Sequence, residues 1–344
     1  IRIPFPQAVF CEQTDLVYYL KKHHHPLIVN LTNTAPAFYK NQIVTIHDLM
    51  FLKNPKWYSK KHYYFYKNLF RQIARNSKKV VTVSNFSKKE IIKYFNVPEN
   101  RIEVVYNAVS QEFIELARQN FENNTNQYKP NSNDGVGCRG EAPAQNHFPL
   151  PGEGVGGGVN TSLNANWYNY GRYILAVSSL DPRKNFINLI QAFDKLKLKD
   201  VKLLIVGDKG VMQSQKHFAA LIKDNPDIIF TGHITDKELA GLYKNAILFV
   251  FPSLYEGFGI PPLEAMACGC PTVVSKIASI PEVCADASYY IDPNDINSIA
   301  KGIQEVLNSE SMQNDLREKG LKRVKHFSWR DSAQKYVDII QNLN

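Results

Sequence analysis

The sequence predicts an α/β protein made of two doubly wound, parallel-sheet domains. Short apolar runs rich in β-branched and aromatic residues alternate with helical stretches, which is the rhythm of βα units. The chain has 344 residues, 44% of them hydrophobic, which is enough for two cores of ordinary size. A stretch rich in Asn, Gly, Pro and Ser interrupts this rhythm at 122–169. We therefore expect a first domain over 1–115, a low-complexity insertion over 116–170 and a second domain over 171–325.

We expect the strands of both domains at short runs in which apolar residues do not alternate with polar ones. Such continuous runs are typical of sheets that are covered by helices on both faces. In the first domain the predicted strands are 27–31, 43–46, 80–83 and 102–105, with helices at 58–75 and 88–95. In the second domain the predicted strands are 173–177, 202–206, 228–230, 247–251 and 272–274, and helices follow at 296–307 and 331–343. This order of elements favours parallel sheets.

The most informative segment follows a predicted strand of the second domain. Gly257 and Gly259 allow the backbone to turn sharply, and Pro261 and Pro262 fit the first turn of the helix that comes next. A strand, a glycine turn and a helix in this order direct backbone N–H groups and the positive end of the helix at one point. We therefore expect an anion to bind beside this loop.

Two glutamates, Glu256 and Glu264, lie eight positions apart across this loop and the start of the helix. A carboxylate repels a phosphate, whereas it accepts paired hydrogen bonds from vicinal hydroxyls. One glutamate for a transferred sugar and one for a ribose is therefore a coherent assignment. The alternative is a solvated loop glutamate and a glutamate in the first turn of a helix, both of which are common in α/β proteins.

Further candidate residues follow other predicted strands. Arg183 and Lys184 come shortly after the strand at 173–177, and a cation pair at the carboxyl end of a strand suits a diphosphate. His47 ends the strand at 43–46 and should project from the edge of the first sheet. The alternatives are a solvated charge pair at a helix entry and an ordinary core or surface histidine.

The chain as a whole resembles a known family. The segment from Glu256 to Glu264 is similar to the EGFG and E-x7-E signature of retaining glycosyltransferases of the GT-B fold, in family 4, also called glycosyl transferases group 1. Other motifs are similar and stand in family order: VTIHDL at 44–49, VTVSNFSK at 81–88, VVYN at 104–107, DPRKN at 181–185, LIVG at 204–207 and FSW at 327–329. Within the family, the chain resembles bacterial mannosyltransferase-like enzymes of surface-polysaccharide assembly.

The resemblance implies two Rossmann-like domains that face a cleft, the first of them incomplete, and a last helix within 326–344 that crosses back to the first domain. It implies transfer of a hexose, such as mannose, from a nucleotide sugar to a bacterial surface glycan or a lipid-linked acceptor. The donor would carry GDP or UDP. No metal ion or other cofactor would be required, because cationic side chains and helix N-termini neutralise the leaving group.

Two residues would act on the reacting sugar. The resemblance places His47 near the C6 hydroxyl of this sugar, where it shapes the transition state, and makes Glu256 the second catalytic residue. Retention would come from same-face transfer, in which the donor phosphate accepts the proton of the acceptor while the sugar becomes oxocarbenium-like.

The remaining site residues would hold the donor: Arg183, Lys184, Gly257, Phe258, Gly259 and Glu264. The cation pair would stabilise the departing nucleoside diphosphate. The backbone amides of the glycine loop would orient the donor sugar, and the second glutamate would bind the ribose.

The sequence begins at Ile1, and its first residues do not form the strand and glycine-rich turn with which the family opens. By that comparison we expect about two βα units to be absent from the first domain. A truncated transferase that binds nucleotide without turnover is therefore an alternative function.

The charge pattern suggests a membrane partner. The net charge is +9, and cations gather between residues 53 and 101, interleaved with aromatic residues. Such a segment suits an anionic membrane surface, where each cation contributes about 1 kcal/mol, and would bring an enzyme to a lipid-linked acceptor. Solvated helix faces are an equal alternative. A basic nucleic-acid-binding protein is the rival class, but no nucleic-acid-binding motif is present and we expect no nucleic acid to bind.

The sequence also bears on location. No apolar run is long enough to span a bilayer, and no signal segment opens the chain. The five cysteines are an odd number and do not show the regular spacing of a disulfide framework, so we expect them to be reduced thiols. The expected location is the cytoplasm, with peripheral attachment to the inner face of the membrane.

Overall fold

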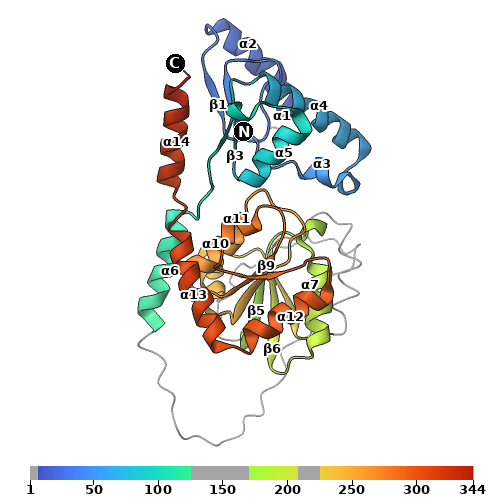
Figure 1. Cartoon of the computed structure of the whole chain (residues 1–344), viewed down its shortest axis with the longest axis vertical. Coiled ribbons are helices and arrows are strands. Elements are labelled where there is room, and N and C mark those ends of the chain that lie inside the picture. Colours follow the sequence, from blue (N-terminus) through green and yellow to red (C-terminus); the bar gives the residue numbers. More distant parts are fainter. Residues whose placement is uncertain (1–6, 125–169, 208–224, 344) are drawn as a thin grey trace, which may run out of the picture.

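The computed structural model describes residues 7–124, 170–207 and 225–343 (Figure 1). Their strands form two sheets, one of four strands and one of six, and every strand pair is parallel. The two parallel-sheet α/β domains predicted from the sequence are confirmed. Residues 125–169, which make up most of the predicted insertion, lie outside the described residues. None of the helices in the described ranges is both long enough and apolar enough to cross a bilayer.

The first sheet consists of β1 (Ile28–Asn30), β2 (Gln42–Thr45), β3 (Lys79–Thr82) and β4 (Ile102–Val104) in chain order. Its helices are α1 (Gln7–Gln13), α2 (Asp15–Lys22), α3 (Met50–Lys53), α4 (Lys60–Asn76) and α5 (Asn85–Phe95). The strand predictions hold to within one or two residues, because central positions such as Ile43, Val44 and Val80 are fully buried and apolar. Helices α1 and α2 were not predicted.

The second sheet has the spatial order β10-β9-β8-β5-β6-β7. Its strands are β5 (Arg172–Val177), β6 (Val201–Val206), β7 (Ile228–Gly232), β8 (Leu248–Phe251), β9 (Thr272–Ser275) and β10 (Tyr289–Ile291). The direction of winding reverses between β5 and β8, so this sheet is doubly wound. The four described strands of the first sheet show no such reversal. Strand β10 was not predicted, because three residues are too few to show a pattern.

Helices cover both faces of the second sheet, which therefore separates two cores. Along β5, Tyr173 and Leu175 belong to one core, whereas Ile174 and Ala176 belong to the other. The first core includes residues of α9 (Asp236–Asn245), α10 (Ile260–Ala267) and α11 (Ile280–Cys284), and the second includes residues of α7 (Phe186–Leu196), α12 (Ile296–Leu307) and α13 (Glu310–Val324). Burial on both faces explains why these strands are continuous apolar runs.

Residues 116–124 of the predicted insertion are helical, which corrects its boundary. They belong to α6 (Gln111–Asn124), which starts inside the predicted first domain. Phe113 of α6 lies edge-on to Tyr243 of α9, with ring centroids 6.2 Å apart, so this helix packs on the second domain. The buried pair Phe113 and Ala117, four residues apart, was the sequence signal for this helix.

The helix α14 (Trp329–Gln341) packs against the first sheet, although it follows the second domain in the chain (Figure 1). Ile339 forms a small core with Ile43 and Val81, which lie on the two central strands. The hydroxyl of Tyr336 lies 2.7 Å from that of Thr45. The end of the chain therefore supplies part of the cover of the first sheet.

Glu282 of α11 joins the two domains through the N-terminus of α5. Its carboxylate accepts hydrogen bonds from the backbone N–H of Asn85 at 2.7 Å and of Phe86 at 3.0 Å. The Tyr106 hydroxyl donates to the same carboxylate at 3.0 Å. A carboxylate at this position satisfies free N–H groups and interacts favourably with the helix dipole.

We predict that Glu282→Ala lowers the melting temperature by about 2–6 °C, because the lost hydrogen bonds to a charged group contribute roughly 1–3 kcal/mol. Thermal unfolding followed by circular dichroism measures the change. Glu305→Ala, on an exposed position of α12, is the control and should have little effect. An equal melting temperature for wild type and Glu282→Ala would contradict this role.

Candidate active site at the domain junction

The predicted donor-binding residues lie at the point where the second sheet reverses its winding. Arg183 and Lys184 follow β5, and the loop that contains Glu256 and Gly257 follows β8. These two strands are neighbours in the sheet, with Ile174 opposite Leu248. Loops that leave adjacent strands in opposite directions leave space between them for a ligand. The fold thus brings together residues that are more than 70 positions apart in the sequence.

A short 3-10 turn, Pro182–Lys184, fixes the cation pair. The side chain of Asp181 accepts a hydrogen bond from the backbone N–H of Arg183 at 3.0 Å and caps the start of the turn. Asn185 ends the turn in the left-handed region, with φ 61°. Its side-chain amide donates to the carbonyl oxygens of Pro252 at 3.1 Å and Pro293 at 2.6 Å. The turn after β5 is therefore fastened to the loop after β8.

Glu256 is held by three side chains. Its carboxylate accepts from Lys184 Nζ at 2.7 Å, Arg183 Nη1 at 3.2 Å and Ser253 Oγ at 2.6 Å. Lys184 and Glu256 are only 6% and 7% exposed. Burial lowers the pKa of Lys184, and the attraction of Glu256 opposes that shift. Asp181 also lies 3.7 Å from Arg183 Nε, so the two cations are balanced by two carboxylates, and the site presents a guanidinium and an ammonium group held in fixed positions.

From the sequence, the cations were expected to bind a diphosphate and Glu256 a sugar hydroxyl, without any contact between them. The structure brings all three side chains together, and this contact was not predicted. Glu256 therefore holds the side chains of Arg183 and Lys184 in position. This role is separate from any hydrogen bond that it makes to a sugar hydroxyl. Ser253 was also missed, although a serine three residues before the glutamate on a tight loop was a usable signal.

The glycine loop is anchored through its carbonyl groups. Ser84 Oγ, in the first domain, donates to the carbonyl oxygen of Gly257 at 2.7 Å. Ser279 Oγ lies 2.9 Å from the carbonyl oxygen of Glu256 and 2.8 Å from that of Phe258. The amides of Gly257, Phe258 and Gly259 make no hydrogen bond to any residue that the structure describes. These N–H groups are thus the ones that a ligand can use.

His47 lies directly against the glycine loop. A Cβ atom on Gly257 would come within 2.4 Å of the His47 carbonyl oxygen and 2.9 Å of Asp48 Cβ, so only glycine fits here. The ring Nε2 of His47 lies 3.0 Å from the carbonyl oxygen of Leu31. Since a carbonyl only accepts, Nε2 carries the proton and Nδ1 is free to accept from a sugar hydroxyl when the ring is neutral.

Asp48 and Tyr58 add to the site from the first domain, and no role was predicted for either. Burial raises the pKa of Asp48, with a smaller opposing effect of Arg183 and a raising effect of Glu256. Burial, reinforced by Asp48 and Asp181, raises the pKa of Tyr58 to about 12. Tyr58 therefore stays protonated at neutral pH and can donate a hydrogen bond. Asp48 directly follows His47 in the sequence, so it could have been recognised as a candidate site residue.

Glu264 lies apart from the cation cluster, on α10. Its carboxylate accepts a hydrogen bond from the Tyr243 hydroxyl at 3.2 Å. Burial raises the pKa of Glu264 to about 7, and the Tyr243 hydrogen bond opposes that shift. A glutamate that is only partly ionised at neutral pH can both accept from and donate to a diol.

Tyr255 connects the loop to the first domain and was also missed. Its hydroxyl donates to Glu90 of α5 at 3.0 Å and accepts from the backbone N–H of Leu49 at 3.3 Å. Its ring is in edge contact with that of Phe86, with centroids 5.6 Å apart. The site is therefore built from both domains, and one loop of the second domain makes most of the contacts.

Comparison with known proteins identifies the family. The model of glycosyl transferases group 1 matches residues 164–323, and that of glycosyltransferase family 4 matches residues 7–113. The O-antigen chain mannosyltransferase B of Escherichia coli is 30% identical over 319 residues, which are 90% of this chain and 74% of the relative. The chain belongs to the group 1 glycosyltransferases. This glycosyltransferase is also 27% identical to the Escherichia coli mannosyltransferase WbdA, over 88% of its own length and 33% of the relative.

A solved structure supports the fold of the glycosyltransferase. The Anabaena protein Alr3699/HepE, crystallised with UDP and glucose, superposes with a TM-score of 0.67 over 95% of this chain and 81% of the other, at 16% identity. At this identity the likeness shows the fold alone. The predicted GT-B fold is confirmed.

We predict that Glu264→Gln changes how stability depends on pH. The carboxyl group is expected to bind its proton more tightly in the folded state, so between its unfolded pKa of about 4.5 and its folded pKa of about 7 the wild type loses stability as pH rises. Glutamine cannot ionise and avoids this loss. The stability of the variant relative to wild type should therefore increase by roughly 1–3 kcal/mol from pH 5 to pH 8.

Urea denaturation at the two pH values measures the difference, with Glu305→Gln as the exposed control. A difference between Glu264→Gln and wild type that is the same at both pH values would rule out a carboxyl group that titrates in this range.

Proposed function

We propose that this glycosyltransferase moves a hexose, with mannose as the first candidate, from a nucleotide sugar to a growing bacterial surface glycan or its lipid-linked precursor. The single observation that carries the reaction is the buried cluster of Arg183, Lys184 and Glu256 at the switch point of the second sheet, next to His47. The names of the relatives, O-antigen and serotype-specific mannosyltransferases, support the sugar and the glycan. The UDP in the Anabaena structure supports a nucleotide donor.

The proposed reaction keeps the configuration of the sugar. The bond between the anomeric carbon and the donor phosphate breaks, the acceptor oxygen bonds to that carbon from the same face, and the acceptor proton passes to the departing phosphate oxygen. Arg183 and Lys184 would neutralise the charge that develops on the diphosphate. Glu256 is a poor nucleophile, because two cations and a hydroxyl hold its oxygens, and this supports a route without a covalent intermediate.

The other residues of the site would orient the donor. The free amides of Gly257, Phe258 and Gly259 would bind the donor sugar, and His47 Nδ1 would accept from its C6 hydroxyl. Glu264 would bind the ribose. The cations of the protein and the N-terminus of α10 would neutralise the diphosphate, so the proposed reaction needs no metal ion or other cofactor.

The donor is tested by ligand-observed NMR of the chain with GDP-, UDP- and ADP-sugars. Saturation transfer to the ribose and sugar protons of one donor is expected and would name the base. Transfer of radiolabelled sugar to a lipid-linked acceptor then tests turnover. Donor binding without transfer would support the alternative of a transferase-like protein that only binds nucleotide.

We predict different effects for the two glutamates. Glu264→Ala should weaken donor binding about tenfold, because the hydrogen bonds of its carboxyl group to the ribose are lost. Glu256→Ala should mainly reduce transfer, by about 10² or more, because the cations lose their positioning partner. Glu256→Gln keeps an acceptor and serves as the second variant if Glu256→Ala does not fold, since removing one partner of a buried ion pair costs about 3–5 kcal/mol.

Donor dissociation constants and single-turnover rates are the two measurements, with Glu305→Ala as the control. Wild-type behaviour of both glutamate variants in both assays would sink the assignment.

We further propose that α4 docks the enzyme on an anionic membrane surface. Tyr64 and Phe65 of this helix are 61% and 52% exposed. They lie among exposed cations of the same helix, Lys60, Lys61, Lys67 and Arg71. Aromatic rings in a basic helix suit the boundary between headgroups and acyl chains. This placement would bring the first domain to a lipid-linked acceptor at the inner face of the membrane in the cytoplasm.

The double variant Tyr64→Ser/Phe65→Ser should bind phosphatidylglycerol vesicles at least about fivefold more weakly, because two rings no longer enter the interface. Vesicle sedimentation measures the binding. Phe38→Ser is the matched control, because Phe38 is 79% exposed and lies outside α4. Equal binding of wild type and double variant, or tighter binding to duplex DNA than to vesicles at the same salt, would contradict membrane docking.

A further inference from the structure

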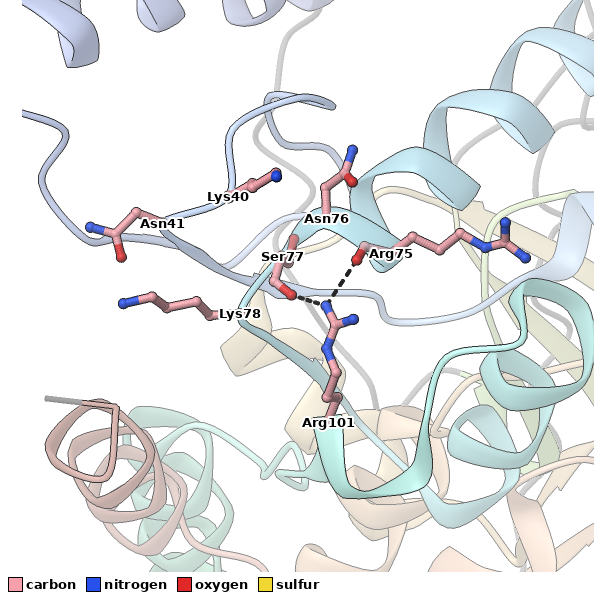
Figure 2. Close-up of a pocket in the computed structure, with 7 residues that line it drawn as sticks. All are labelled: Lys40, Asn41, Arg75, Asn76, Ser77, Lys78 and Arg101. Carbon is pink, nitrogen blue, oxygen red and sulfur yellow. Dashed lines mark hydrogen bonds between the residues drawn. The ribbon is translucent and has the colours of Figure 1, made fainter.

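A second basic site lies at the amino ends of the strands of the first sheet, whereas His47 lies at their carboxyl ends. A surface cavity of about 550 Å³ is lined by residues that precede three neighbouring strands (Figure 2). Lys40 and Asn41 precede β2, Ser77 and Lys78 precede β3, and Arg101 precedes β4. His47 follows the other end of β2. Seven residues of extended chain put the two sites on the order of 20 Å apart.

The lining of this cavity is positively charged. Lys40, Arg75, Lys78 and Arg101 contribute four cations, and no lining residue is acidic. The carboxylates nearest in sequence have other partners: Glu103 pairs with Lys79 at 2.9 Å, and Glu99 pairs with Lys88 at 3.3 Å. Like charges in one concave surface raise the local potential and attract anions.

Structural roles account for only two of these cations. Arg101 Nη2 donates to the carbonyl oxygens of Arg75, at 3.0 Å, and of Ser77, and so caps the end of α4 (Figure 2). Arg75 Nε donates to the carbonyl oxygen of Phe95 at 3.0 Å. The backbones of Lys40 and Lys78 bond to Gln42, but their ammonium groups make no hydrogen bond or ion pair with any described residue, so the fold does not need their charges.

We propose that this cavity is a binding site for a phosphate group, presented either by a soluble diphosphate or by a lipid headgroup. The Arg101 guanidinium is already fixed in place and loses little freedom on binding, and the lysines of the same lining have long side chains that can turn toward a bound anion and add charge-assisted hydrogen bonds. The site is independent of the proposed transfer reaction, because it shares no residue with the donor site.

Calorimetric titration of the full chain with sodium pyrophosphate tests the proposal. Lys40→Gln/Lys78→Gln should weaken binding at the cavity by about tenfold or more, because two of the four charges are lost. The matched control is Lys53→Gln/Lys89→Gln, which removes the same charge from exposed positions outside the cavity. Arg183→Gln serves to separate the two anion sites and should leave binding at the cavity unchanged.

Equal pyrophosphate binding by wild type and Lys40→Gln/Lys78→Gln would overturn the proposal, and so would binding that is lost in Arg183→Gln alone. Sedimentation with phosphatidylglycerol and phosphatidylcholine vesicles then identifies the source of the phosphate. A loss of phosphatidylglycerol binding in Lys40→Gln/Lys78→Gln, with no loss in the control, would identify a headgroup. Loss of pyrophosphate binding with unchanged vesicle binding would identify a soluble diphosphate.

Discussion

The burial of Lys184 is the constraint on which the arrangement of the site depends. An ammonium group with so little exposure needs a partner, since an unpaired charge in such a place costs several kcal/mol. Glu256 supplies it, and in doing so ties the turn after β5 to the loop after β8. Once these two segments are fastened, the direction of Arg183 and the path of the glycine loop are also set. The contact with the first domain follows, because Gly257 then lies against His47.

Much of the fold could be predicted from the sequence. Strands such as β3 and β8 are buried on both faces, so their residues are apolar without alternation and the pattern is unambiguous. Helix α6 was missed because low-complexity sequence follows it directly, and β10 because it is short. The spacing of apolar residues thus predicted an element correctly wherever all residues of that element share the same degree of burial.

The site could be predicted only in part. Glu256, Gly257 and Lys184 could be proposed as site residues because each lies in a recognisable local motif, and the structure places the three close together. Their mutual contacts depend on which strands are neighbours, and that information is not local. The pairing of Tyr255 with Glu90 joins residues 165 positions apart and leaves no local trace in either segment.

The position of α14 has a consequence for how the chain is made. Thr45 and Tyr336, which lie in contact, are 291 positions apart in the sequence. Ribosomes release a chain from its N-terminus, so β2 and β3 emerge long before the helix that covers Ile43 and Val81. During synthesis these apolar positions stay uncovered until α14 emerges, and by then all strands of the second sheet have been made. The first domain is therefore expected to complete its packing after the second domain, although its strands are encoded first.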